Sequence, residues 1–360
     1  MNELDSQEKP CFVGIKMADT TRAAFNDSAT AEDFRELAKQ PRVTTLQCSE
    51  PVRDSVWSLV NEHFCRVRPD VNLRVYAHYL FECDLSFARL LTNVRHFSAD
   101  CLMDAKNVEA IAAMTGLESL DIGIFELKDF SVLNLVTPKL TSLSLSATRS
   151  KKPSLAPLSR FRSLQQLYIE GHHKEIEVLS ELSELGDVTL RSVSTPGVEY
   201  LANLSKLWSL DIKLGGIRDF QGIEGKESIK YLELWQVREL SNIDFVSTLP
   251  GLQYLFLQSL PQIQSIPQLR NSSMLRRVVI ENLKGLSDFT SLETAPALEE
   301  FALMDARKQT PQQLLPVLNN PNVRRVSAHF VSLRKYSEFQ HMREKSGKDE
   351  MNRWDTFEYR

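Results

Sequence analysis

A six-residue frame with apolar residues at positions 1, 4 and 6 recurs along most of this chain of 360 residues. The spacing is most regular from residue 229 onward, where Ile229, Leu252, Leu275 and Leu298 each begin a copy 23 residues after the last. Self-similarity at a period of roughly 20–50 residues indicates stacked units that bury one continuous core. Thirteen copies can be aligned, and they begin at Val43, Val71, Val94, Leu117, Leu140, Leu164, Leu185, Leu207, Ile229, Leu252, Leu275, Leu298 and Val323.

Each frame is typical of a β-strand with one buried face, because positions 4 and 6 alternate with positions 3 and 5. The only polar residue at an apolar position is Arg74, and we interpret it as a one-residue shift that makes Leu73 and Val75 the inward pair. Parallel strands require crossover connections, which are nearly always right-handed. The sequence therefore predicts an α/β fold with a parallel sheet on one side of the core and short helices or 3₁₀ turns on the other.

The connections between the strands carry helix signals of their own. Residues 55–67 have apolar residues at helical spacing, so the first long connection is expected to hold a full helix. Aspartate followed by phenylalanine or leucine recurs before the strands, and aspartate favours the start of a helical turn. The following ring is expected to fill the interior between two coils. We therefore predict that Phe220, Phe245 and Phe289 are buried.

The repeat sets the expected domain boundaries. Residues 1–30 are polar and without a period, which indicates a flexible N-terminal arm or a cap. Residues 31–330 form the predicted solenoid of about 13 repeats. Residues 331–360 leave the pattern, with a helical stretch followed by the aromatic, strand-like end RWDTFEYR. We interpret them as a C-terminal cap, because an open end would expose core and unpaired strand groups.

The repeated frame, as in IKYLEL, LQYLFL and LRRVVI, resembles that of the leucine-rich-repeat superfamily over about residues 31–330, with units similar in length to the cytosolic types of 22 to 23 residues. The resemblance implies a right-handed solenoid in a curved arc, with the parallel sheet on the concave face and short helices on the convex face. It also implies a binding scaffold, usually for a protein, without catalysis of its own. One departure is that the asparagine expected three residues after position 6 is missing, and its slot holds Phe125, Thr148, His172, Val193, Gly215, Val237, Leu260 and Leu283.

The composition is typical of an ordinary soluble protein, with 25% charged residues and a formal net charge of −4. This charge disfavours nucleic acid as the partner. The sequence contains no run of about 18 apolar residues, so no membrane span is expected. The first residues do not resemble a secretory signal. An odd number of cysteines, none resembling a disulfide-bonded cap, favours a reducing, cytoplasmic location. The cysteines, expected to be small buried apolar side chains, are Cys11, Cys48, Cys65, Cys83 and Cys101.

No motif that carries chemistry stands out. The cysteines and histidines of the first third lack the close pairs, such as CxxC, that zinc sites use. His172 and His173 are interpreted as part of a solvated turn. The chain has no glycine-rich phosphate loop, nucleophile elbow or HExxH signature. The sequence therefore predicts no catalytic residue, no metal site, no cofactor and no enzymatic activity.

Outward positions of the strands supply the candidate binding site. Tyr231, Trp235, Tyr254 and Phe256 are expected on one exposed face, because strands about 4.8 Å apart bring such rings together. Acidic residues at neighbouring positions form a rim. The alternatives are that the C-terminal segment or the N-terminal arm folds over the rings, or that the rings merely stack across strands. The predicted partner-binding residues are Tyr168, Glu170, Asp211, Tyr231, Glu233, Trp235, Tyr254, Phe256 and Glu281.

These features favour a non-catalytic interaction scaffold that binds a partner protein on its concave sheet. The acidic rim suggests a partner with a basic face, and a lone repeat protein of this size fits a bacterial immunity or effector role. The alternative is a module that binds a small ligand or carbohydrate by stacking on the aromatic strip. That alternative requires planar amides beside the rings, for which Gln166 and Gln258 are the candidates.

Overall fold

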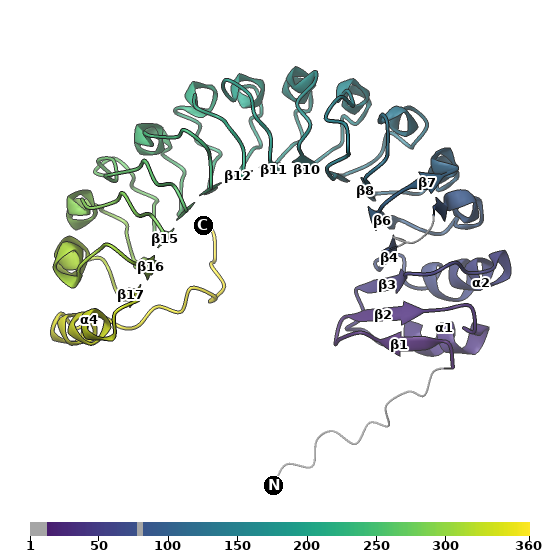
Figure 1. The fold of residues 1–360 in the computed structure, drawn as a ribbon, viewed down its shortest axis with the longest axis horizontal. Coiled ribbons are helices and arrows are strands. Elements are labelled where there is room, and N and C mark those ends of the chain that lie inside the picture. Colours follow the sequence, from purple (N-terminus) through teal and green to yellow (C-terminus); the bar gives the residue numbers. More distant parts are fainter. Residues whose placement is uncertain (1–12, 78–81) are drawn as a thin grey trace, which may run out of the picture. The chain divides into compact units, whose positions relative to one another are not determined.

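The computed structural model describes residues 13–77 and 82–360. The chain divides into two compact units, Met1–Leu164 and Gln165–Arg360, and each is described by itself. Both units repeat one theme, in which a strand is followed by a connection that carries a short helix and leads to the next strand (Figure 1).

The sheet of the unit Met1–Leu164 has the order β1-β2-β3-β4-β6-β8-β9. β1 and β2 are antiparallel, and every later pair of neighbours in this sheet is parallel. Its strands are β1 (Ile15–Met17), β2 (Arg22–Phe25), β3 (Thr45–Cys48), β4 (Asn72–Tyr76), β6 (His96–Leu102), β8 (Ser119–Ile124) and β9 (Ser142–Leu145). A two-stranded parallel sheet is formed by β5 (Cys83–Asp84) and β7 (Ala105–Lys106). The helices are α1 (Ala31–Ala38), α2 (Asp54–Leu59), the π-helix η1 (Val60–Cys65), and the 3₁₀ helices η2 (Leu85–Leu90), η3 (Val108–Ala113), η4 (Ser131–Asn134) and η5 (Ala156–Arg160).

The sheet of the unit Gln165–Arg360 is entirely parallel. Its strands are β10 (Gln166–Glu170), β11 (Asp187–Arg191), β12 (Ser209–Lys213), β13 (Tyr231–Trp235), β14 (Tyr254–Gln258), β15 (Arg277–Glu281), β16 (Glu300–Ala306) and β17 (Arg325–Phe330). The 3₁₀ helices are η6 (Ile176–Glu181), η7 (Glu199–Leu201), η8 (Gln221–Ile223), η9 (Asp244–Thr248), η10 (Thr290–Thr294) and η11 (Pro311–Leu314), and the α-helices are α3 (Leu315–Asn319) and α4 (Leu333–Lys345). In this unit the short helices lie on one side of the sheet (Figure 1).

The core follows the apolar frame of the sequence. Inward residues such as Leu232 and Leu255 are fully buried. The shifted repeat is confirmed, because Leu73 and Val75 are buried while Arg74 points outward and pairs with Asp100 at 2.7 Å. The helix expected within residues 55–67 is present as α2 and η1. The period therefore identified which side chains hold the coils together.

The predicted burial of Phe220, Phe245 and Phe289 is confirmed, since these residues are 3%, 7% and 1% exposed. The rings of Phe220 and Phe245 stack with 4.3 Å between their centroids. The aspartate before the ring helps to start the next helical turn. The carboxylate of Asp219 accepts the backbone N–H of Gln221 at 2.8 Å, and the same bond recurs at Asp129 and Asp288.

A ladder of backbone hydrogen bonds takes the place of the missing asparagines. One residue after each of several strands has a positive φ, as at Ser192 and Leu214. The N–H of Leu214 then donates to the carbonyl of Trp235 on the next coil at 2.8 Å. The asparagine slot itself is filled mainly by buried apolar residues, for example Val237 and Leu260. At these positions, buried apolar side chains and bonds between adjacent backbones join successive turns.

The two histidines of the predicted solvated turn differ in their environment. His172 occupies the asparagine slot and is completely buried, so the prediction is wrong for this residue. His173 is exposed, in agreement with the prediction. The prediction for His172 failed because it did not take into account that the side chain at this position points into the core.

The predictions for the two ends of the chain agree with the structure to different extents. Residues 1–12 of the expected arm lie outside the described residues, and residues 15–25 form the β1–β2 hairpin beside β3. The predicted C-terminal helix is confirmed as α4, where Phe339 packs on Phe330 of β17 with 5.8 Å between ring centroids. The strand predicted in RWDTFEYR is wrong, because residues 353–360 form no strand.

Candidate functional site

The nine predicted binding residues lie on β10, β12, β13, β14 and β15, all in the unit Gln165–Arg360. They occupy outward positions, because the alternating residues of the same strands, such as Leu232, are buried. Parallel pairing places Glu233 opposite Phe256 and Trp235 opposite Gln258. We call this surface the strand face, and it is the side of the sheet opposite the short helices (Figure 1).

The aromatic side chains lie across β13 and β14. The rings of Tyr231 and Tyr254 meet edge to face with 5.1 Å between their centroids. The guanidinium carbon of Arg191 lies 5.5 Å from the centroid of Trp235. All four rings, Phe256 included, are half-buried, so the expectation of a fully exposed patch is wrong. Contacts across strands cover part of their surface, and the end of the chain covers part of Tyr254 and Phe256.

Two of the predicted acidic residues form a buried cluster rather than a rim. Asp211 and Glu233 are each 8% exposed. The Nζ atom of Lys213 lies 3.1 Å from a carboxylate oxygen of each. The hydroxyl of Tyr231 donates a hydrogen bond of 2.9 Å to Glu233. One ammonium group therefore balances two carboxylates in a site with little water.

The other two acidic residues are also paired within the chain. Arg191 Nε lies 3.0 Å from Glu170, whose carboxylate also accepts a hydrogen bond from the Tyr168 hydroxyl at 3.3 Å. Glu281 forms an ion pair with Arg353. Each predicted carboxylate thus has a cationic partner, which reduces the negative potential that a partner would meet.

The buried cluster predicts a pH-dependent stability. Burial, and then the neighbouring Glu233 carboxylate, raise the pKa of Asp211 from 3.8 to about 7 against the opposing effect of Lys213. A raised carboxyl pKa favours folding below the unfolded pKa, and this contribution is lost as the pH rises from about 4 through about 7. We expect Asp211→Asn to differ least from the parent at pH 4 and to gain about 1–3 kcal/mol in unfolding free energy relative to it by pH 8.

Denaturant unfolding of both proteins between pH 4 and pH 8 tests this expectation. Asp121→Asn is the matched variant, because Asp121 has the same strand position in the other unit and burial raises its pKa to about 6. Its gain should therefore begin at the same pH, level off at a lower pH and be smaller. An unchanged difference between Asp211→Asn and the parent across the whole range would contradict the assignment.

The C-terminal tail, residues 351–360, lies against the strand face (Figure 1). Met351 is 3% exposed and packs with Val279 in a cluster that Tyr254 and Phe256 border. The alternative in which the C-terminal segment folds over the rings is therefore confirmed for Tyr254 and Phe256.

The side chain of Phe357 makes the main contact of the tail with the strand face. The ring of Phe357 lies 5.4 Å from that of Tyr254. The guanidinium carbons of Arg276 and Arg277 lie 5.1 Å and 4.9 Å from its centroid, as in cation–π contacts. Arg276 also donates a hydrogen bond of 2.8 Å to the carbonyl of Glu358. The ring is thus held between an aromatic side chain and two cations.

The backbone of the tail is held by side chains of the sheet. Arg277 donates to the carbonyl of Asp355 at 2.9 Å. The amide of Gln253 accepts the N–H of Arg360 at 2.8 Å and donates to its carbonyl at 2.7 Å. The same carbonyl accepts a bond of 2.9 Å from Lys230. These bonds satisfy tail groups that have no strand partner.

Residues 355–360 of the tail follow the amino-terminal ends of the strands, from β15 toward β12. Its Tyr359 ring lies 5.5 Å from that of Trp208, just before β12. Trp208, Lys230, Gln253 and Arg276 all occupy position 2 of the frame. The sequence prediction missed them because it considered only positions 3 and 5 and the residue that follows position 6. A recurrence of large polar or aromatic residues at position 2 was the available signal.

The cysteines are confirmed as buried side chains in three cases. Cys48, Cys65 and Cys83 are buried, and burial raises the pKa of each thiol to about 12, which keeps it protonated. Cys101 is exposed, contrary to the expectation, and Cys11 lies outside the described residues. Within residues 13–77 and 82–360, no group of three histidine, cysteine or acidic residues could hold a metal ion. In the same part of the chain, no helix is long and apolar enough to cross a membrane.

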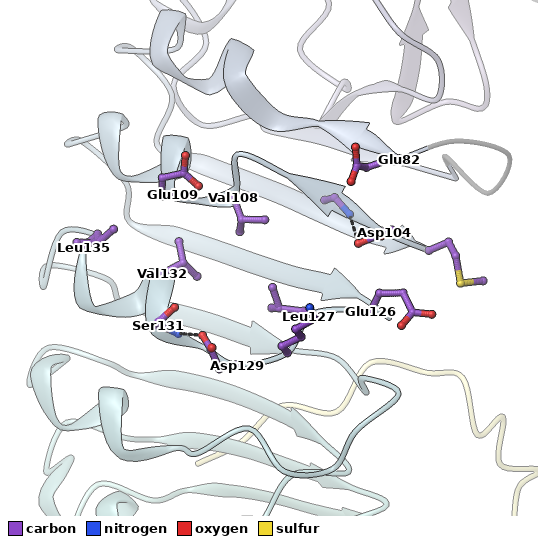
Figure 2. A pocket seen from close by; sticks show the side chains of 13 residues that line it. Glu82, Asp104, Val108, Glu109, Glu126, Leu127, Asp129, Ser131, Val132 and Leu135 are labelled. Atoms are coloured by element: carbon purple, nitrogen blue, oxygen red, sulfur yellow. Dashed lines mark hydrogen bonds between the residues drawn. The ribbon is translucent and has the colours of Figure 1, made fainter.

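A groove of about 660 Å³ lies on the unit Met1–Leu164, and none of the predicted residues lines it (Figure 2). Val108, Val132 and Leu135 belong to its apolar part. Its acidic residues have partners, for example Glu126 with Arg149. The remaining acidic lining residues are Glu82, Asp104, Glu109 and Asp129. Ion pairs engage Glu82 and Glu109, and backbone N–H groups hold Asp104 and Asp129, so these side chains already have partners within the chain.

Comparison with known proteins identifies the fold. No protein-family model matches the chain, and no curated protein matches its sequence. An internalin (inlF) from Listeria monocytogenes superposes with a TM-score of 0.59 at 20% identity, over 87% of each chain. A TLR13–ssRNA13 complex superposes with a TM-score of 0.52 at 15% identity, over 83% of this chain and 46% of that one. The chain thus spans about half the length of the second neighbour, and it has the fold of a leucine-rich-repeat solenoid.

Proposed function

We propose that the strand face of the unit Gln165–Arg360 binds a partner protein and carries out no catalysis. The observation that supports this most strongly is the position of Trp235. Its large ring lies at the carboxyl end of β13, outside the core, opposite Lys213 of β12 and Gln258 of β14, and the guanidinium carbon of Arg191 on β11 lies 5.5 Å from its centroid. Tryptophan, tyrosine and arginine are the residues that most often dominate binding energy at protein interfaces.

The binding surface consists of outward residues at the carboxyl ends of β10 to β13, beyond the track that the tail follows. The ion pairs among Glu170, Arg191, Asp211 and Lys213 fix their side chains before a partner arrives. Fixed side chains lose little conformational entropy on binding. The surface is therefore suited to a folded or extended protein segment with both apolar and polar groups.

The charge of this surface favours a protein over a nucleic acid. Each carboxylate has a cationic partner, so the surface has mixed charge, whereas nucleic-acid sites concentrate unpaired lysine and arginine. The structural neighbour titled as a complex with ssRNA13 makes RNA the natural competitor in any binding test. A partner with a basic face, the concave shape of the sheet and a bacterial immunity or effector role stay predictions.

A small-ligand or carbohydrate function is the second candidate. Gln258 lies opposite Trp235 on the next strand and donates a hydrogen bond of 3.1 Å to Glu281. An amide beside an aromatic ring is an arrangement that a sugar could use. The amide is already oriented by Glu281, which leaves fewer donors for a sugar and favours the protein partner.

The first test replaces Trp235 with alanine. Because the ring is outside the core, we expect the melting temperature to stay nearly unchanged, while partner binding weakens by about 2 kcal/mol or more. Affinity enrichment with quantitative mass spectrometry would compare the parent and the variant, and titration of the purified partner would then give the affinity.

Phe125→Ala is the matched control, because Phe125 is an aromatic residue that is 40% exposed in the other unit. A genuine partner is retained by this control and lost with Trp235→Ala. Unfolding of the Trp235 variant would make the ring structural. An undiminished affinity in a folded variant would exclude the surface, and enrichment of RNA or glycans alone would favour the competing functions.

A further inference from the structure

We propose that the track along the amino-terminal ends of β12 to β15 binds an extended peptide segment of a partner protein. This segment carries two aromatic residues that are separated by one other residue. In this proposal the C-terminal tail fills the site until such a segment displaces it. The inference deepens the proposed function, on which the existence of a partner rests, but the site itself can be tested with the chain's own sequence.

The first support is that much of the recognition is directed at backbone. Gln253 is 1% exposed and bonds both the N–H and the carbonyl of Arg360. This pair of bonds imitates the edge of a neighbouring strand, which any extended peptide can satisfy. Arg277 adds a bond to the carbonyl of Asp355, five residues earlier. A segment from another chain could therefore use the same donors and acceptors.

The second support is that the side-chain contacts select a pattern. Phe357 fits between Tyr254 and two guanidinium groups, and Tyr359 lies edge to face against Trp208. The rings of Phe357 and Tyr359 also contact each other, with 4.9 Å between their centroids. An aromatic residue, one variable residue and a second aromatic residue are thus the side chains that the track recognises.

The third support is that the tail is held in a way that permits release. It forms no strand, so no backbone ladder fixes it along its length. Trp354 is 78% exposed and Tyr359 is 38% exposed. Segments without a strand ladder open at lower cost than the core. A partner segment competes with a local tail. Its apparent affinity is therefore its intrinsic affinity multiplied by the fraction of molecules whose track is free.

The test uses the full chain and a labelled peptide of residues 353–360, RWDTFEYR, as the probe. In the receptor, Phe357→Ala and Tyr359→Ala weaken the tail in place without removing it. We expect fluorescence anisotropy to show at least about tenfold tighter peptide binding to this receptor than to the parent, because the site is then mostly free. Adding Gln253→Ala to the receptor should reverse the gain.

The peptide is varied in the same experiment. A peptide with Phe357→Ala should bind at least about tenfold more weakly, since it loses the ring held by two cations. A peptide with Trp354→Ala is the matched control and should bind within about twofold of the original, because this ring points to solvent. If the double variant melts several degrees below the parent, Tyr359→Ala alone replaces it as the receptor.

Two results would overturn the proposal. One is a tail-weakened, folded receptor that binds the peptide no better than the parent. The other is equal binding of the original and Phe357→Ala peptides, which would show adhesion without recognition. Neither result bears on the Trp235 test, because Trp235 lies at the opposite end of its strand from the track. Failure of the proposed function and failure of this site are therefore distinguishable.

Discussion

Replacing Phe289 with alanine is expected to lower the free energy of unfolding by about 3–5 kcal/mol. Phe289 is 1% exposed and meets Phe301 edge to face, with 6.2 Å between the ring centroids. It lies between two coils, just before η10, where the carboxylate of Asp288 bonds the N–H of Thr290. Removing the ring takes away buried apolar surface and leaves a cavity that the neighbouring coils cannot fill without shifting.

Denaturant unfolding followed by fluorescence measures this loss. Leu333→Ala is the control, because Leu333 is an apolar residue that is 85% exposed, and its truncation should cost less than about 0.5 kcal/mol. A loss below about 1 kcal/mol for Phe289→Ala would mean that the ring contributes little to the packing between coils. That outcome would contradict the role assigned to the aspartate–phenylalanine pairs.

The sequence predicted the core well because the same apolar frame recurs in every repeat. Each strand must bury positions 4 and 6, and a slip by one residue would expose them all. The register was therefore recoverable even at Arg74, where Leu73 and Val75 restore the pattern. The connections were predictable for a similar reason, since phenylalanine recurs at one offset from the strands, as at Phe220 and Phe289.

The environment of outward residues was less predictable, because it depends on which long side chains meet across strands. Asp211 and Glu233 occupy outward positions and are nevertheless buried, since Lys213 and Tyr231 close over them. Strands about 4.8 Å apart allow such contacts but do not dictate them. The alternation of a strand predicts direction, whereas exposure also requires the identity of the neighbours.

The position of the tail over the aromatic rings was only one of several alternatives in the sequence analysis, because the contacts of the tail do not follow the repeat. Residues 107 positions apart meet where Gln253 binds the backbone of Arg360. Backbone groups of the tail carry no residue-specific signal, so the pattern of side chains could not reveal them. What the sequence did contain was the recurrence of large polar or aromatic residues at position 2, at Trp208, Lys230 and Arg276.

One buried ion pair beneath the tail gives the second large effect. Arg277 is 2% exposed and donates from Nε to Glu300 at 2.5 Å, and Glu300 also pairs with Arg325. We expect Glu300→Ala to lower the free energy of unfolding by about 3–5 kcal/mol, because it leaves the Arg277 guanidinium buried without its carboxylate. The remaining hydrogen bond to the Asp355 carbonyl does not neutralise the charge.

A double variant separates the buried charge from the shape of the site. Replacing the pair with apolar residues, as Arg277→Met with Glu300→Leu, removes both charges and should recover much of the stability lost in Glu300→Ala. Glu299→Ala is the control, since its pair with Arg276 lies one position earlier and is partly exposed, and its loss should stay near 1 kcal/mol or less. If Glu300→Ala costs no more than this control, water reaches Arg277. If the double variant is as unstable as Glu300→Ala, the carboxylate stabilises the unit through contacts other than charge compensation.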